Sequence, residues 1–399
     1  MKYCRFLLPA FLALIPVAGC RDKNTQLIMP EKLFELPIGK TETDLAFFNS
    51  NRVSPLTETQ IKMRDGLIYI LDPGTNKLME FNSYGEILTL WYHPDENPKP
   101  ALLKEESDVD RDSQKEATKK AFPFRFHHLT GFAVNSQKQI YIADRLPRES
   151  ALDSAEYGLS LNQNVVCFSK TGKAEYILGQ EGISGNPFPY ITDISVDRND
   201  CLNITCYTKS DKVFFKYDSK GNLLSKTVIS DKMIPAIQKD SVSRQAEILP
   251  TANPDHILIR TDIYGERTNS NNTVHYDFMK TVMWVYDLKQ NAFQGYFNLP
   301  NTETKVADTA SWAENSYPVM LTTDGFDHRG NLYFSSIEQQ DIERVLILNQ
   351  ISRNIETRRI FTAFEKSIMI KRFVTPEGII LGIVFYPDKA EICWWRTDL

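Results

Sequence analysis

Residues 132–144 read FAVNSQKQIYIAD, which is two short apolar strands joined by a polar turn. The same design returns as ISVDRNDCLNI at 194–204 and as DGFDHRGNLYF at 324–334. The turn opens at Asn135, Asp197 and Asp327, five residues before the second strand resumes in each stretch. Asn and Asp suit this position because their side chains cap tight turns. The repetition predicts that a β-hairpin is the recurring unit of the fold.

Two further strands follow each hairpin. The third ends in an aromatic residue and a tight turn, at 81–85, 168–172 and 217–221, and at 286–291 without the glycine. The fourth strands are expected at 86–92, 174–178, 222–229 and 292–299. Four antiparallel strands joined by short turns make one blade of a β-propeller.

The units can be counted from their second strands, which contain Ile68, Ile140, Leu202, Ile257, Leu332 and Ile380. These positions are 48 to 75 residues apart, which leaves insertions at 93–121, 145–163, 263–276 and 300–316. The last unit has only three strands, at 370–376, 379–386 and 391–397, so we expect the piece from Lys32 to Ile38 to supply its outer strand. The prediction is an all-β, six-bladed β-propeller over residues 32–399, with four antiparallel strands per blade and a ring closed by an N-terminal strand.

The N-terminus has the pattern of an export signal. Lys2 and Arg5 precede a charge-free apolar run from Phe6 to Gly19, which is shorter than the ~20 residues that a membrane-spanning helix needs. The small residues before Cys20 resemble the lipobox of bacterial lipoproteins, which implies cleavage before Cys20 and acylation of that cysteine. An ordinary signal peptide with a chance cysteine, or a buried N-terminal helix, are the alternatives. The expected layout is a signal peptide at 1–19, a lipidated tether at 20–31, and a membrane-anchored propeller in the bacterial cell envelope, facing the periplasm or the exterior.

One junction carries a family resemblance. Residues 177–197 read ILGQEGISGNPFPYITDISVD, where spaced glycines and a proline lead into a strand ending in Val-Asp. This resembles the junction between NHL repeats, and the whole chain resembles an NHL-like, six-bladed propeller lipoprotein of bacteria. The other junctions are degenerate, and the match is poorest over 246–299.

Composition excludes some functions. The formal net charge is −5, so the chain lacks the basic footprint of a nucleic-acid-binding protein. Beyond Cys4 and Cys20 only four cysteines remain, too few for a disulfide framework in a chain of this length. No Gly-x-Ser-x-Gly, His-Glu-x-x-His or EF-hand motif occurs.

Candidate channel residues lie on or just before the first strands of their units. They are His127, His128, Asp193, Asp324 and Arg372. Gluconolactonase-like enzymes on six-bladed propellers hold a divalent cation at such positions, but a Ca²⁺ site needs six or more oxygens and only two carboxylates are available here. The expectation is therefore no cofactor, no metal and no catalytic residue. A metal-dependent hydrolase, lactonase or lyase with a central-channel site is the alternative function.

The leading hypothesis is a non-catalytic binding or scaffold protein for a protein or cell-envelope ligand, attached to the membrane through its acyl chains. The insertion at 93–121 is the candidate binding loop because it is longer than a blade turn requires. Its charged residues are Lys104, Glu105, Glu106, Asp108, Asp110, Arg111 and Asp112. The alternative interpretation of this segment is a solvated surface excursion.

Overall fold

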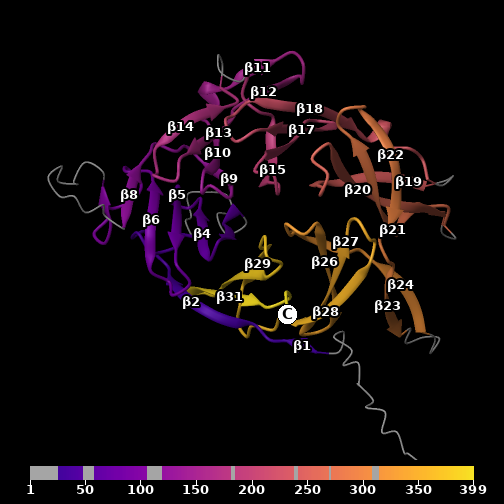
Figure 1. The fold of residues 1–399 in the computed structure, drawn as a ribbon. Coiled ribbons are helices and arrows are strands. Elements are labelled where there is room, and N and C mark those ends of the chain that lie inside the picture. The colour runs from indigo at the N-terminus through magenta and orange to yellow at the C-terminus, as the bar shows by residue number, and fades with distance from the viewer. Residues whose placement is uncertain are drawn as a thin grey trace, which may run out of the picture.

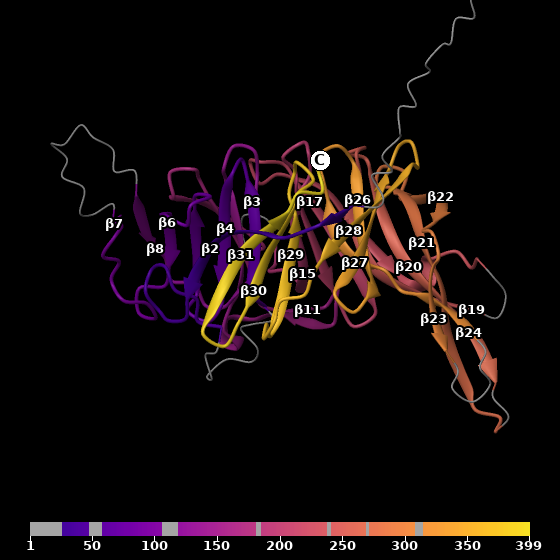
Figure 2. The same cartoon turned by 90° about the horizontal axis from the view of Figure 1, so that it is seen from below.

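The chain forms a ring of radially arranged β-sheets (Figure 1). The structure is a computed structural model, and it describes residues 26–47, 58–105, 119–180, 185–237, 241–268, 271–307 and 314–399. Seen edge-on, the ring is a disc with one projecting arm (Figure 2). Two short 3-10 helices, Arg148–Ser150 and Asp231–Met233, accompany the strands. The predicted all-β propeller is confirmed.

Each large sheet is named here by its innermost strand, and its strands follow in spatial order. The β3 sheet contains β3 (Gln60–Arg64), β4 (Leu67–Asp72), β5 (Lys77–Phe81), β6 (Ile87–Tyr92), β8 (Lys120–Pro123) and β7 (Lys104–Glu105). The β9 sheet contains β9 (Leu129–Val134), β10 (Ile140–Arg145), β13 (Gln163–Phe168) and β14 (Ala174–Leu178), and the β15 sheet contains β15 (Tyr190–Val196), β16 (Leu202–Tyr207), β17 (Asp211–Tyr217) and β18 (Leu223–Ser230).

The second half of the chain continues the series. The β19 sheet contains β19 (Ser241–Pro250), β20 (His256–Thr268), β21 (Val274–Asp287) and β22 (Ala292–Asn298). The β25 sheet contains β25 (Thr322–Phe326), β26 (Asn331–Gln339), β27 (Ile342–Asn349), β28 (Ile355–Phe361) and β1 (Leu27–Ile28), and the β29 sheet contains β29 (Met369–Val374), β30 (Ile380–Phe385), β31 (Lys389–Trp395) and β2 (Glu31–Pro37).

The sequence repeats match these sheets closely. The three quoted hairpins are β9–β10, β15–β16 and β25–β26, all antiparallel. The glycines of the third turns, Gly85, Gly172 and Gly221, have φ values of 81°, 88° and 85°, a region that glycine enters without strain. The uniform four-stranded blade is wrong for two sheets, because β8 and β7 add parallel strands to the β3 sheet and β1 adds one to the β25 sheet.

The predicted pairing of the N-terminal strand is confirmed. β2 pairs antiparallel with β31, so Leu36 lies opposite Ala390 and Glu31 opposite Trp394. Phe34 and Leu36 point into the core, at 8% and 2% exposure, while Glu35 between them points outward. The strand-period alternation of this segment therefore places it as the outer strand of the C-terminal sheet.

The hydrophobic core is divided among the spaces between neighbouring sheets. One cluster joins the β29 and β3 sheets, and others join β3 with β9, β9 with β15, β15 with β19, β19 with β25, and β25 with β29. Trp395, fully buried in the last of these, donates from Nε1 to the carbonyl of Phe361 at 2.8 Å. Each of these sheets is thus held by apolar contacts on both faces.

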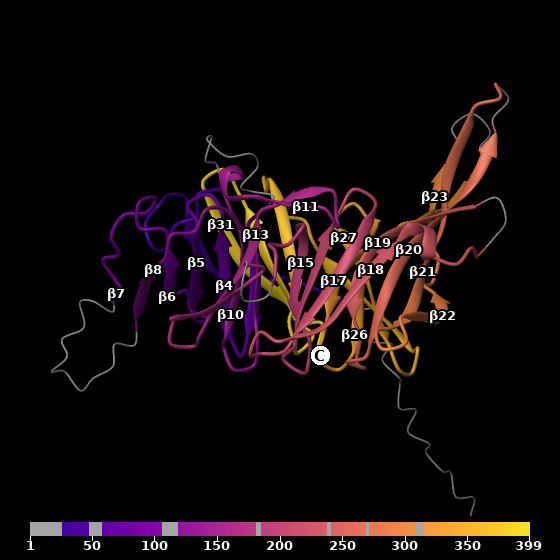
Figure 3. The ribbon, with the colours of Figure 1, turned by 90° about the horizontal axis from the view of Figure 1, so that it is seen from above.

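Three expected loop insertions contain hairpins instead. Residues 145–163 include β11 (Leu152–Ser154) and β12 (Leu159–Leu161), and residues 300–316 include β23 (Thr302–Ala307) and the first half of β24 (Glu314–Val319). At 263–276 the strands β20 and β21 simply continue, and together with β23 and β24 they form the projecting arm (Figure 3). Backbone pairing explains the difference, because strands satisfy their polar groups even beyond the core. Within the described ranges, no helix is long and apolar enough to cross a bilayer.

Candidate functional site

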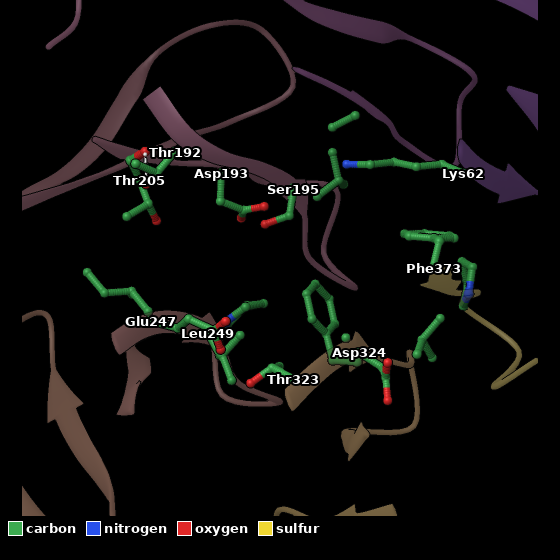
Figure 4. Close-up of a pocket in the computed structure, with 18 of the residues that line it drawn as sticks. Lys62, Thr192, Asp193, Ser195, Thr205, Glu247, Leu249, Thr323, Asp324 and Phe373 are labelled. Carbon is green, nitrogen blue, oxygen red and sulfur yellow. Dashed lines mark hydrogen bonds between the residues drawn. The ribbon is translucent and has the colours of Figure 1, made fainter. Parts of the chain in front are cut away.

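A cavity of about 580 Å³ lies at the centre of the ring. The strands β3, β9, β15, β19, β25 and β29 all contribute to its wall, so every large sheet reaches it with its innermost strand (Figure 4). Its size is within the range of small-molecule sites in proteins. The charged residues of the wall are Lys62, Arg64, Asp193, Lys212, Glu247 and Asp324.

Bulges in four inner strands set the direction of the side chains at the cavity. The pairing registers leave Thr130 in β9, Thr192 in β15, Ala246 in β19 and Asp324 in β25 as the extra residue. A bulge interrupts the regular alternation of a strand and turns its side chains in new directions. The two-residue alternation of a regular strand therefore does not predict which side chains face the cavity.

Lys62 extends from β3 into the cavity towards Asp193 and Ser195 (Figure 4). Its ammonium group donates hydrogen bonds to the backbone carbonyls of Phe132 in β9 and, at 2.9 Å, of Ile194 in β15. Burial lowers the pKa of this group to about 8, although the carboxylate of Asp193 opposes the shift. Lys62 thus links three sheets and leaves its remaining N–H for the cavity.

Asp193 and Ser195 face the part of the cavity between the β15 and β19 sheets. The pairs β3–β9, β9–β15, β29–β3 and β25–β29 are in close contact, whereas β19 makes no comparably close approach to β15 or β25. Asp193 is exposed, and Thr205 and Tyr207 from β16 line the same space. The inner strands are therefore less closely packed beside β19 than elsewhere around the cavity.

Gln245 and Glu247 stand on the β19 side. Arg260, only 4% exposed, lies 3.7 Å from Oε2 of Glu247 and donates to the carbonyl of Leu321 at 2.6 Å. Among the described residues, Oε2 of Glu247 and Nε2 of Gln245 are buried without a hydrogen-bond partner. Such atoms cost free energy unless something else pairs with them.

Asp324 is turned away from the open cavity. Its carboxylate, 3% exposed, forms an ion pair with Arg372 at 3.0 Å, and Arg372 also reaches Glu343 at 2.7 Å. Burial raises the pKa of Asp324 to about 6, and Arg372 only partly offsets the effect. Oδ2 of Asp324 has no hydrogen-bond partner among the described residues.

The pKa of Asp324 predicts a pH-dependent effect on stability. Because its folded-state value of about 6 exceeds the ordinary value of 3.8, ionisation of this group weakens the fold as pH rises from about 4 to about 6. The Asp324→Asn variant stays neutral and therefore avoids this loss. Between about pH 4 and pH 6, its free energy of unfolding should rise relative to that of the wild type by up to about 3 kcal/mol. Urea titrations between pH 4 and 7 measure the difference. Asp388→Asn, at an exposed position, controls for the lost charge, and parallel profiles for Asp324→Asn and wild type would contradict the prediction.

One end of the cavity is closed by the turns that follow the inner strands. Arg64 donates from Nη1 to Nε2 of His328 at 3.0 Å, across the ring from β3 to the turn after β25. Arg64 also lies 3.9 Å from Asp200, which accepts from the backbone N–H of Ser136 at 2.8 Å. Burial and the charge of Arg64 lower the pKa of His328, which keeps Nε2 available as an acceptor.

The predicted channel residues are only partly brought together. Asp193 and Asp324 line the cavity, and Arg372 stands behind Asp324. His127 and His128 are not among the residues that line the cavity: Nδ1 of His127 lies 3.1 Å from Asp144, and Nε2 of His128 lies 2.9 Å from Glu58. Both histidines precede β9, and their backbone N–H groups donate to Asp144.

The residues do not fit the metal site of the alternative function. No group of three or more His, Cys, Asp or Glu side chains gathers closely enough to hold a metal ion in the part of the chain that the structure describes. Asp324 is directed at Arg372 instead of at Asp193.

Sequence reasoning missed Lys62, Gln245 and Glu247. The sequence could have indicated Lys62, because it is a lysine between the apolar residues Ile61 and Met63 on an inner strand. Glu247 carried none, because the β19 region matched the repeat least well. Of the candidate binding loop, Lys104 and Glu105 form β7, while Glu106, Asp108, Asp110, Arg111 and Asp112 lie outside the described residues, as does Cys20.

Comparisons with known proteins give remote similarities. No family model matches the chain, and no curated protein matches its sequence significantly. Among solved structures, an exported protein from Bacteroides fragilis is 11% identical, with 92% of this chain and 94% of that chain covered and a TM-score of 0.40. The β-propeller domain of the Trilobed protease from Pyrococcus furiosus is 8% identical, with 92% and 95% covered and a TM-score of 0.38.

A longer protein is also similar. The dihydro-heme d1 dehydrogenase NirN is 8% identical with a TM-score of 0.34, covering 84% of this chain, and this chain spans only 62% of its length. Because these TM-scores are below 0.5, the function has to be argued from the residues of this chain.

Proposed function

We propose that the protein is a lipid-anchored β-propeller of the bacterial cell envelope that binds a ligand in its central cavity without transforming it. The observation that carries this proposal is the cavity of about 580 Å³, at which Nε2 of Gln245 and Oε2 of Glu247 are buried without a hydrogen bond from any described residue. The charged groups nearby are already engaged: Asp324 with Arg372, Glu247 with Arg260, and Lys62 with two carbonyls. These contacts hold the side chains in fixed positions, which suits the recognition of a ligand.

The proposed architecture is a six-bladed, NHL-like ring. Its support is the succession of sheets that begin at β3, β9, β15, β19, β25 and β29, each joined to its two neighbours by a hydrophobic cluster. The junction at 177–197 supports it further, because it leads from β14, the outer strand of one sheet, to β15, the inner strand of the next.

The proposed location depends on Cys20. Two or three acyl chains hold a protein stably on a membrane, whereas one chain holds it only marginally. Cys20→Ser should therefore be released into the soluble fraction or should keep its signal peptide uncleaved. Fractionation of cells, with immunoblotting against the propeller, checks this. A variant that is processed and stays with the membranes would contradict the anchor.

The binding function is tested by filling the cavity. Ser195→Phe places a ring in the space beside Asp193, and Ser160→Phe places the same ring on the exposed strand β12 as the control. Small molecules released by denaturing protein isolated from its own cells are measured by mass spectrometry. We expect one compound in near-stoichiometric amount from wild type and Ser160→Phe, and little from Ser195→Phe.

The same experiment separates the other functions. Replacing residues 97–119 by a short Gly-Ser linker should leave the bound compound unchanged, because loop-closure entropy changes slowly with length. Loss of the compound on this replacement would move the binding site to that loop. A stoichiometric divalent metal in the wild type, lost in Asp193→Ala, would favour the metal-dependent hydrolase.

A further inference from the structure

The unpaired atoms of the cavity include both kinds of hydrogen-bonding group. Among the described residues, Nε2 of Gln245 is a donor and Oε2 of Glu247 is an acceptor, and neither has a hydrogen-bond partner. Asp193 adds an exposed carboxylate, and Lys62 adds its remaining N–H. A hydroxyl group can form a hydrogen bond with each of these groups, because it donates one hydrogen bond and accepts others.

The charges of the cavity oppose a charged ligand. The wall contains three acidic residues, Asp193, Glu247 and Asp324, and three basic ones, Lys62, Arg64 and Lys212. Three of these charged side chains form ion pairs within the protein, namely Asp324 with Arg372, Glu247 with Arg260, and Arg64 with Asp200. A ligand with a net charge would meet both attraction and repulsion here. The free energy of removing its charge from water would then exceed the electrostatic gain in the cavity.

Partly exposed aromatic rings complete the wall. Tyr207 is 46% exposed, and Phe326 and Phe373 are half-buried at the same cavity. Leu249 and Pro250 add apolar surface on β19. Aromatic faces beside hydrogen-bonding groups match a molecule that has an apolar C–H face and a rim of hydroxyls.

We infer that the cavity binds a neutral, polyhydroxylated ring compound, namely an uncharged mono- or disaccharide. This inference rests on the proposed binding function and names its ligand class. The hydroxyl rim pairs with Gln245, Glu247 and Asp193, and a C–H face packs on Tyr207.

Calorimetric titration with defined sugars tests the inference. Glucose, N-acetylglucosamine, maltose and chitobiose are the neutral probes, and glucosamine and glucuronate are their charged counterparts. We expect at least one neutral sugar to bind, and glucosamine and glucuronate to bind at least tenfold more weakly than that sugar. Binding of none of the neutral sugars, or tighter binding of a charged one, would overturn the inference.

Matched variants tie the binding to the cavity. Tyr207→Ala should weaken the sugar at least threefold, and Tyr276→Ala, whose ring is similarly exposed at 48% on β21, should not. Gln245→Leu should weaken it about three- to tenfold, and Gln294→Leu on the exposed face of β22 should not. Melting curves establish that each variant is folded, and if Gln245→Leu fails to fold, the tyrosine pair decides. Equal affinity for wild type and Tyr207→Ala would reject the site.

The outcome is distinguishable from failure of the binding function itself. If no neutral sugar binds but a compound is still released from wild type and not from Ser195→Phe, the ligand class is wrong and the binding function stands. If no neutral sugar binds and no compound is released from wild type, both the ligand class and the binding function are wrong.

Discussion

Asp72→Ala should destabilise the protein by about 3–5 kcal/mol, because it leaves a fully buried lysine without its counter-ion. Asp72 and Lys77 both have 0% side-chain exposure, with Oδ2 and Nζ 3.8 Å apart. Burial lowers the pKa of Lys77, and the carboxylate of Asp72 is the main group that opposes this. Chemical denaturation at neutral pH measures the loss.

The carboxylate of Asp72 also organises the backbone around it. It accepts from the backbone N–H of Ala46 at 3.1 Å, from that of Gly74 at 2.9 Å, and from Oγ1 of Thr75 at 2.8 Å. Lys77 in turn donates to the carbonyl of Thr41 at 2.7 Å. The pair therefore fastens the segment after β2 to the β3 sheet, where the two ends of the ring meet.

Two controls make this prediction specific. Asp72→Ala/Lys77→Met removes both charges and should be less destabilised than Asp72→Ala alone, because no unpaired ammonium remains. Asp95→Ala breaks an exposed ion pair with Arg125, 3.0 Å apart, and should cost at most about 1 kcal/mol. Equal losses for the Asp72 and Asp95 variants would mean that the buried pair has no special role.

The repeating hairpins could be predicted from the sequence because each depends on local signals. Asn135, Asp197 and Asp327 each accept hydrogen bonds from backbone N–H groups of their own turn, as Asx-turn residues do. The alternation of Phe34, Glu35 and Leu36 likewise depends on nothing outside the strand. Local chemistry of this kind is readable without a structure.

The cavity could be predicted only in part because its side chains are positioned by non-local pairing. The bulge at Thr192 depends on how β15 pairs with β16, and the bulge at Asp324 on how β25 pairs with β26. No residue type marks either position in the sequence. The direction of Asp324 towards Arg372 follows from the packing of the β25 sheet on the β29 sheet.

The projecting arm shows the same limit. Residues 263–276 break the repeat spacing, so the sequence predicts a loop there. In the structure Tyr264 and Phe278 pack edge to face at 5.9 Å, which supports continued pairing of β20 and β21 beyond the disc. A cross-strand pair of rings of this kind favours strand over loop, and the sequence does not show that the two rings lie opposite each other.

Deletion of residues 31–39 should abolish the cooperative unfolding transition and cause aggregation. The deletion removes β2 and exposes the edge of β31, leaving a row of unpaired backbone groups. It also removes Phe34 and Leu36 from the core, each contributing about 1.5–3 kcal/mol. Size-exclusion chromatography and thermal melting measure both effects.

A point substitution tests the same closure without shortening the chain. Leu36, 2% exposed, packs in the cluster between the β29 and β3 sheets, so Leu36→Ala should cost about 2–5 kcal/mol. Glu35→Ala, on the outward face of the same strand, should hardly change the melting midpoint. If the deletion variant melts like the wild type, β2 does not close the ring. If only Leu36→Ala is mild, the backbone pairing with β31 is what holds the strand, because that pairing survives the substitution and is lost only in the deletion.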